Sequence, residues 1–500
     1  MIQIHNKIYI FFLFGISILM GSYQQTAPNL AYEKEFYKVL EYGIITEEQD
    51  AFVMNQPYDY QTSQDILYRA SLNEWSELLL SRFAYNKPDD GNIERIGLKI
   101  SPGISKSSIG SNESSVMLKV EGLISIGETV LVNRFRLNDA KLKSDTEFHG
   151  DTNEWLFGYF DESYAAISLN NRIELFLGRM NRNFGTLNDY GLIMSNNSYA
   201  FDHFGFSATG DQLKYSFYVS RLNDILGEDI QGTTMPADTL MNTKRYWAIQ
   251  RLDWRISNNF QIALSEATVY GGPDQNWVPS YLNPVHFFYA AQRNQGEQLN
   301  SFWQINIFWK PCNRIGMYFD LFADDLIINN ESGVNDRDRY PDRLGFLWKI
   351  SFTDVFQEKS LTSIRYVRIW NETYTSYRTF ENYRYFNKSI GYPLNSYEGV
   401  KLSHSSFDQF PWILSGDIEI WRHGNSNIIE VFYDEVVSFP NGPVTYGINA
   451  ELNHVSYDWH GFEIKLNTKI VWSADSWDNL FDNPDVSRSF DFQILYPYSF

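Results

Sequence analysis

Apolar and polar side chains alternate along most of this chain, up to its last residue. In the final stretch, SFDFQILYPYSF, an aromatic or aliphatic residue stands at every second position from Phe490 to Phe500. Successive side chains of a β-strand point to opposite faces, so this stretch has one apolar and one mostly polar face. An antiparallel sheet packed on a soluble core and a membrane barrel surrounded by lipid both give this pattern. The rest of the chain must decide between them.

Segments with a period of two recur from about residue 88 onward. In GFEIKLNTKIVW, for example, Phe462, Ile464 and Leu466 alternate with Glu463 and Lys465. The stretches PVTYGINAELN, WILSGDIEIW and LKYSFYVS follow the same rule. Their lengths are close to the ~9–11 residues that a tilted strand needs to cross a bilayer. The pattern therefore indicates a series of membrane-crossing strands.

The connections between these segments alternate between very short and long. The short ones are 125–127, 210–211, 257–259 and 311–313, and the long polar ones are 139–153, 180–200, 223–243, 271–300, 323–341 and 371–395. Bacterial outer-membrane barrels have short periplasmic turns and longer extracellular loops. We therefore predict an all-β transmembrane barrel over residues 91–500, with about 18 antiparallel strands. A secreted soluble all-β protein is the alternative, but it needs no such alternation.

The barrel prediction also explains the alternation in the last strand. Unpaired backbone groups in lipid each cost several kcal/mol, so the terminal strand is expected to pair with the first strand. A terminal strand that ends in Phe also resembles the signal by which outer-membrane barrels are recognised for assembly. We therefore expect the barrel assembly machinery to be a partner.

The start of the chain has a different character. A basic residue and an apolar run precede Gly21 and Ser22, which predicts a secretory signal peptide over residues 1–22. Residues 23–90 have a helical period, in YEKEFYKVLEYG, where Gly43 is a stop signal, and in SLNEWSELLLSRF. We expect a small periplasmic helical element whose apolar stripes pack on each other or on the barrel.

Composition excludes several classes of function. A formal net charge of −20 argues against nucleic acid as a partner, because phosphate binding needs a basic surface. Cys312 is the single cysteine and cannot form an internal disulfide. The sequence has no phosphate-binding Gly-rich motif, zinc spacing or G-x-S-x-G motif, so we expect no cofactor and no metal. A lipid hydrolase built from one of the scattered histidines stays open as a third alternative.

The polar faces of the strands should line the lumen, and several carry charge. The charged positions are Arg134, Arg136, Arg172, Glu174, Arg251, Asp253, Arg255 and Arg365. One interpretation is a channel or binding site for an anionic solute, and the other is mutual pairing inside the lumen. We favour pairing, because arginines and carboxylates occur together. A solute-conducting porin is accordingly the main alternative function.

The loop that follows Leu177 concentrates residues suited to an acidic sugar. It contains Arg179, Arg182 and Asn183, with Tyr190 further along. Guanidinium groups offer forked donors that fit carboxylates. The sequence therefore indicates a binding site for an acidic saccharide in this loop.

The same region resembles a known family. In ELFLGRMNRNFGTLNDYGLIMSNNSYAFDHFGFS, a strand ends in Gly178-Arg179, and a second basic residue and Phe184-Gly185 precede an FDHFGFS-like strand. This stretch is similar to the Wzi-type capsule-assembly proteins of Gram-negative outer membranes. The later stretch YLNPVHFFYAAQRNQGEQLNSFWQINIFWKPCNRIGMYFDLFADDL adds to the likeness. The resemblance implies a surface lectin that holds capsular polysaccharide on the cell and has no catalytic activity.

The loop 271–300 adds aromatic rings, amides and a guanidinium, which suit the C–H faces and hydroxyl edges of sugars. The residues that we predict to bind polysaccharide are Arg179, Arg182, Asn183, Tyr190, Trp277, Tyr281, Asn283 and Arg293. The other interpretation is that long extracellular loops are rich in such residues whatever they bind. We expect a monomer in the outer membrane, in contact with its lipid and lipopolysaccharide and with an acidic surface polysaccharide.

Overall fold

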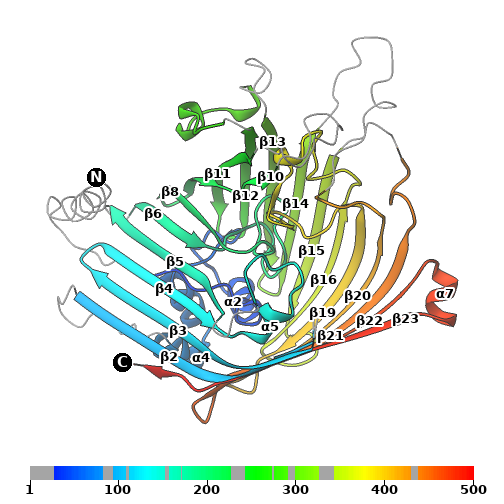
Figure 1. Ribbon diagram of the computed structural model, residues 1–500. Helices are drawn as coiled ribbons and strands as arrows, with labels where there is room; N and C mark the ends of the chain where they lie inside the picture. Colours follow the sequence, from blue (N-terminus) through cyan, green and yellow to red (C-terminus); the bar gives the residue numbers. More distant parts are fainter. Residues whose placement is uncertain are drawn as a thin grey trace.

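The computed structural model describes residues 28–82, 94–108, 112–152, 157–169, 172–226, 242–272, 275–290, 299–325, 343–429 and 437–499. In this part of the chain, eighteen long antiparallel strands pair in chain order and close into a cylinder (Figure 1). The predicted fold class, an all-β transmembrane barrel, is thereby confirmed. The strands are β2 (Glu94–Ser107), β3 (Glu113–Ile126), β4 (Thr129–Leu137), β5 (Gly158–Leu169), β6 (Ile173–Met180), β8 (Phe201–Thr209), β9 (Leu213–Arg221), β11 (Asn242–Ser257), β12 (Phe260–Gly272), β13 (Leu299–Cys312), β14 (Ile315–Asp325), β15 (Arg343–Thr353), β16 (Ser360–Ile369), β19 (Tyr397–Ser406), β20 (Trp412–His423), β21 (Thr445–Trp459), β22 (Phe462–Ala474) and β23 (Asp485–Leu495).

Shorter elements complete the fold. The helices are α2 (Lys34–Thr46), α3 (Tyr60–Arg69), α4 (Asn73–Arg82), α5 (Ala140–Ser144), α7 (Trp477–Asp482), η2 (Pro279–Leu282) and η4 (Thr379–Glu381). The two-residue strands are β1 (Asn55–Gln56), β7 (Asn183–Phe184), β10 (Ile225–Leu226), β17 (Arg384–Tyr385), β18 (Lys388–Ser389) and β24 (Tyr498–Ser499). Among the described helices, none has both the length and the apolar character needed to cross a membrane.

The first and last strands meet, as expected, and form the seam of the cylinder. β23 pairs with Gly103–Ser107 of β2, and β24 pairs with Lys99–Ile100 in the same register. Between them Pro102 has no N–H to donate, although its carbonyl accepts a hydrogen bond from Tyr496 N at 2.9 Å. A Cβ on Gly103 would lie 2.0 Å from the carbonyl oxygen of Ile494, so the seam needs a glycine there.

The outer face of the wall is apolar. Leu177, Leu264 and Leu452 point outward from β6, β12 and β21 and are 57%, 52% and 49% exposed. A band of exposed apolar side chains around a closed barrel is what contact with lipid requires. The alternation read from the sequence therefore sorts lipid-facing from lumen-facing residues.

The two rims differ, as the connection lengths predicted. The short-turn rim carries connections 127–128, 210–212, 258–259 and 313–314, and the long-loop rim carries the long connections. β2 begins at the short-turn rim, because Glu94 pairs with Ile126 beside the first short turn. Tyr498 and Ser499 of β24 pair with this first half of β2.

The helices α2, α3 and α4 form a plug inside the barrel (Figure 1). We expected an element beside the barrel, and periodicity alone could not place it in the lumen. Gly43 does not end the first helix, because α2 continues to Thr46 and buries Ile44 and Ile45. A Cβ on Gly43 would lie 2.9 Å from Cγ2 of Ile66, so this glycine lets α3 approach α2 closely.

Candidate functional site in the lumen

The plug packs tightly on the inner wall around its short-turn half. Phe36, Leu40 and Trp75 of the plug share one buried cluster with inward residues of the strands, among them Phe308 and Ile413. Burial of such side chains contributes roughly 1.5–3 kcal/mol each. The plug is therefore part of the folded core of the barrel.

A buried carboxylate ties the plug to the wall and to a loop. Glu41 of α2 accepts hydrogen bonds from Lys349 Nζ at 2.8 Å, Ser351 Oγ at 2.7 Å and Asn188 Nδ2 at 2.7 Å. Glu41 is 0% exposed. Charge-assisted hydrogen bonds satisfy this buried charge, so plug, wall and loop are held in one arrangement.

Two long loops fold inward and occupy the other half of the lumen. They are residues 181–200, between β6 and β8, and residues 370–396, between β16 and β19. Leu192, Tyr374 and Tyr383 of these loops are 0% exposed and belong to one cluster with inward residues of the strands. Tyr374 Oη donates to the carbonyl of Leu192 at 2.7 Å, which joins the two loops.

The filling of the lumen is uneven. Inward residues of β12, β13 and β15, such as Ala267, Phe302 and Leu347, are 0% exposed. On β21 and β22, in contrast, the inward Asn449, Glu451 and Asn467 stay partly exposed. Plug and loops therefore leave the inner face of this part of the wall accessible.

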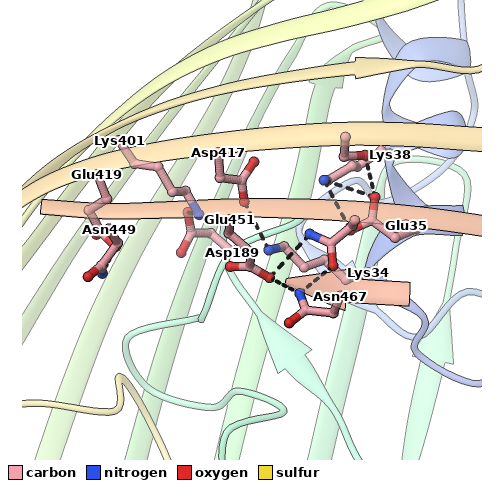
Figure 2. A network of polar contacts seen from close by, with 12 residues as sticks. Lys34, Glu35, Lys38, Asp189, Lys401, Asp417, Glu419, Asn449, Glu451 and Asn467 are labelled. Carbon is pink, nitrogen blue, oxygen red and sulfur yellow. Dashed lines mark hydrogen bonds and ion pairs between the residues drawn. The ribbon is translucent and has the colours of Figure 1, made fainter. Parts of the chain in front are cut away.

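This accessible face carries a polar network, which we call the polar wall (Figure 2). The polar wall consists of Lys401, Asp417, Glu419, Asn449, Glu451 and Asn467 on β19 to β22. Asn467 Nδ2 donates to Glu451 at 2.6 Å, and Asn449 Nδ2 donates to Glu419 at 3.3 Å. Lys34, at the start of α2, reaches Asp417 at 3.2 Å and keeps 37% of its side chain exposed.

Asp189 brings loop 181–200 to the polar wall. Its carboxylate accepts a hydrogen bond from Arg365 at 2.9 Å and lies 3.7 Å from Lys401 Nζ. Burial acts to raise the pKa of this carboxyl, but the positive charges of Arg365, Lys401 and Lys349 outweigh it and hold the pKa well below its usual range. Asp189 is therefore ionised and compensates the cations of the lumen.

Most lumen charges are paired, which is the interpretation that the sequence favoured. Arg134 pairs with Glu162, Arg136 with Asp161 and Asp139, Arg251 with Asp253, and Arg365 with Asp189 and Glu419. Breaking such a buried pair costs about 3–5 kcal/mol, because one charge is left uncompensated. These residues stabilise the lumen, and none of them is free to bind an ion.

The structure separates the residues that we predicted on the 177–200 stretch. Arg179 lies on the outer side of the wall and pairs with Asp202 at 3.1 Å. Arg182 and Asn183 are 5% and 1% exposed, so neither faces the surface. Tyr190 is 38% exposed, and it interacts electrostatically with Lys34 and Glu451. Of these four residues, only Tyr190 faces the polar wall.

Three of the predicted residues of loop 271–300 lie outside the barrel. Trp277 packs against Tyr246 and Phe204, with ring centroids 4.7 and 5.9 Å apart. Tyr281 is buried against Tyr270 on the same outward face. Asn283 is exposed and caps its own loop by accepting from Val285 N at 3.2 Å. Arg293 lies outside the described residues.

We did not predict the polar wall from the sequence, because its residues are spread over four strands. The only feature that they share in the sequence is a position on the inward-facing side of a strand. Alternation places Glu451 and Asn467 in the lumen, but it does not show which lumen positions stay uncovered. Among the described residues, no group of three or more His, Cys, Asp or Glu side chains could hold a metal ion.

An apolar outer face, a closed antiparallel wall and a polar plugged lumen define the class: this chain is a transmembrane β-barrel of the outer-membrane type. Neither a protein-family description nor a curated relative matches the sequence. Among solved structures, the barrel is similar to Escherichia coli Wzi, described as an outer-membrane protein involved in group 1 capsule assembly and as a carbohydrate-binding β-barrel. The two share 13% identity over 94% of this chain and 100% of that chain, with a TM-score of 0.62.

Two Pseudomonas aeruginosa outer-membrane proteins are less similar. OprD covers 82% of this chain and 95% of its own at 8% identity and a TM-score of 0.46. OpdK covers 81% and 98% at 10% identity and a TM-score of 0.46. At these identities the likeness, including that to Wzi, is one of fold.

Proposed function

We propose that this protein is an outer-membrane β-barrel that binds polysaccharide at the cell surface, where it anchors the polymer or helps to assemble it without catalysis. The observation that carries the proposal is the polar wall, which stays accessible opposite Tyr190 on the inner face of β19 to β22. The fold similarity to Wzi supports the same function.

The chemistry of this place suits a sugar chain. Tyr190 offers a flat ring for the C–H face of a pyranose, while Asn449, Asn467 and Glu451 offer amide donors and carboxylate acceptors for hydroxyl groups. Lys34, which pairs with Asp417 but keeps 37% of its side chain exposed, offers a positive charge to the carboxylate of an acidic sugar. The ligand that this arrangement fits best is therefore an acidic polysaccharide segment.

The filling of the lumen argues against the porin alternative. A porin needs an aqueous channel, whereas here α2 to α4 occupy one half of the cylinder and loops 181–200 and 370–396 occupy much of the other. The polar wall is left as a partly exposed inner face, which suits binding better than conduction.

Binding of acidic polysaccharides by the purified barrel in detergent tests the proposal. Tyr190→Ala should weaken binding about five- to tenfold, the effect of one lost stacking contact. Tyr68→Ala is the matched control, because Tyr68 is 71% exposed on α3 and lies outside the polar wall. Arg179→Ala and Trp277→Ala should bind like the wild type, since both residues lie on the outer side of the wall.

Loss of binding in Trp277→Ala but not in Tyr190→Ala would show that the polysaccharide binds to loop 271–300 and not to the polar wall. No binding to any acidic polymer would contradict the proposal. In cells, deletion of the gene should remove polymer from the surface and leave it in the medium.

A further inference from the structure

A second accessible space lies at the opposite end of the barrel, at the short-turn rim. It is a cavity of about 390 Å³ between α3 with the adjoining plug residues and the inner faces of β6, β8 and β9. At ~30 Å³ per water, it has room for roughly a dozen waters, and it lies within the ~300–1,000 Å³ range of ligand pockets. We call it the rim cavity.

Three buried donors that line the rim cavity have no hydrogen-bond partner in the described part of the chain. They are Asn29 Nδ2, Arg182 Nη2 and Arg255 Nε. Asn29 and Arg182 are 6% and 5% exposed. A buried donor without an acceptor is costly and rare in native proteins. Because the three donors gather at one cavity, water or a ligand inside this cavity has to supply their acceptor oxygens.

Arg182 is held in place for such an occupant. Its Nε donates to Nε2 of His203 at 3.0 Å, and its guanidinium lies over the rings of Tyr218 at 3.9 Å and Phe176 at 4.6 Å. Because the neighbouring contacts fix the guanidinium, little conformational entropy is lost when Nη2 gains an acceptor.

The cavity also has charges of both signs on its walls. Glu174 interacts electrostatically with both Arg182 and Lys214, and the Ser207 hydroxyl lies on the same wall. Two cations can take a carboxylate, while Glu174 and Ser207 can bond hydroxyl groups. A purely anionic ligand would meet repulsion from Glu174, and a neutral sugar would bring no carboxylate to Arg182 and Lys214.

We propose that the rim cavity is a second binding site, which takes a single carboxylated sugar with its carboxylate toward Arg182 and Lys214. Its ring hydroxyls face Asn29, Glu174 and Ser207. The site itself rests on the three unpartnered donors, whereas the choice of a sugar acid rests on the proposed function. In a barrel whose long loops face outward, this site faces the periplasm.

Binding of methyl β-D-glucuronide to the full-length barrel in detergent, measured by calorimetry, tests this inference. Wild-type protein should bind the glucuronide and bind methyl β-D-glucoside at least about tenfold more weakly, the effect of one charge-assisted hydrogen bond. Lys214→Met should weaken glucuronide binding by a similar factor, and Ser207→Phe, which places a ring between the ligand and the wall, should abolish it. Lys469→Met on β22 is the matched control, because Lys469 does not line the cavity.

The variants separate this inference from the proposed function. Tyr190→Ala should weaken binding of the polymer but leave binding of the glucuronide unchanged. Glucuronide binding that is lost in Tyr190→Ala and kept in Lys214→Met and Ser207→Phe would overturn the rim-cavity site and leave the polar wall intact. Wild-type protein that does not bind the glucuronide would also overturn it.

Discussion

Single charged residues stabilise this protein through the ion pairs that they form in the lumen. Asp189, on an inward-folded loop, holds Arg365 of β16 and Lys401 of β19 together. The sequence shows an Asp in a polar loop, and it gives no sign that the loop returns into the barrel. For the same reason Arg182 and Asn183 looked like surface donors, although both are buried.

The pairing of Asp189 predicts a defined dependence on pH. Its pKa in the folded state is below the unfolded value of about 3.9, so its contribution to stability is complete above that value and is lost as pH falls through the folded pKa. Asp189→Asn should lower the free energy of unfolding at pH 7 by about 3 kcal/mol, because two buried cations lose a counter-charge. The difference from wild type should shrink below about pH 4.

Urea titrations in detergent, followed by tryptophan fluorescence, measure this difference at each pH. Asp482→Asn is the control, because Asp482 is exposed on α7 and should give the wild-type curve. An equal difference between wild type and Asp189→Asn at pH 3 and pH 7 would contradict the assignment.

At the scale of elements, loop 275–290 has an unexpected place. It lies against the outer face of β9, β11 and β12, where Tyr289 N donates to Glu266 at 2.9 Å and Gln250 Nε2 donates to the carbonyl of His286 at 2.9 Å. Glu266 lies two residues from the outward-facing Leu264, and so on the lipid-facing side. The loop therefore covers polar groups that lipid could not solvate.

The loop itself should then contact lipid. Val285 and Phe287 are 83% and 50% exposed, and Phe287 also packs on the outward Trp303 of β13, with ring centroids 5.4 Å apart. A nitroxide on Phe287→Cys, in a Cys312→Ser background in liposomes, should be relaxed more by apolar oxygen than by a water-soluble nickel complex, because oxygen partitions into lipid. Asn387→Cys, in the exposed part of loop 370–396, should show the opposite order. If the nickel complex relaxed the nitroxides at positions 287 and 387 equally, loop 275–290 would be in water and the prediction would be contradicted.

Elements differ in how far sequence reveals them. The helical period of residues 23–90 and the alternation of the strands are local signals, and both predicted the right type of structure. Where an element packs depends instead on tertiary contacts, which a local pattern does not reveal. Gly43 looked like a helix stop, but it is a close contact between α2 and α3. Trp277 was predicted from the sequence without its position, and the structure places it outside the barrel against Tyr246.

The whole molecule is a filled cylinder, and its wall was the most predictable part. Outward alternation and the sequence of short and long connections required a closed barrel, because lipid tolerates no unpaired edge. The positions of the plug and of the inward-folded loops could not be predicted in this way. Helix and loop packing inside a wide barrel depends on contacts between residues that are far apart in the sequence. Glu41, which joins plug, wall and loop, is an example.

A filled lumen predicts low conductance. Wild-type protein in a planar bilayer should pass far less current than an open barrel of the same strand number, because plug and loops exclude most of the water path. Deletion of residues 370–396 should raise the conductance, since this removes Tyr374 and Tyr383 from the packed cluster. A large, steady wild-type conductance would instead favour the porin.

The seam between β2 and β23 has a mechanical consequence. β3 pairs with β2 along its whole length, from Glu94 to Ser107, whereas β23 and β24 pair only with Gly103–Ser107 and Lys99–Ile100. The two ends of the wall are thus joined by two separate runs of five and two residue pairs, with Pro102 between them. Sideways tension from the surrounding bilayer has to break these two runs to separate the first strand from the last.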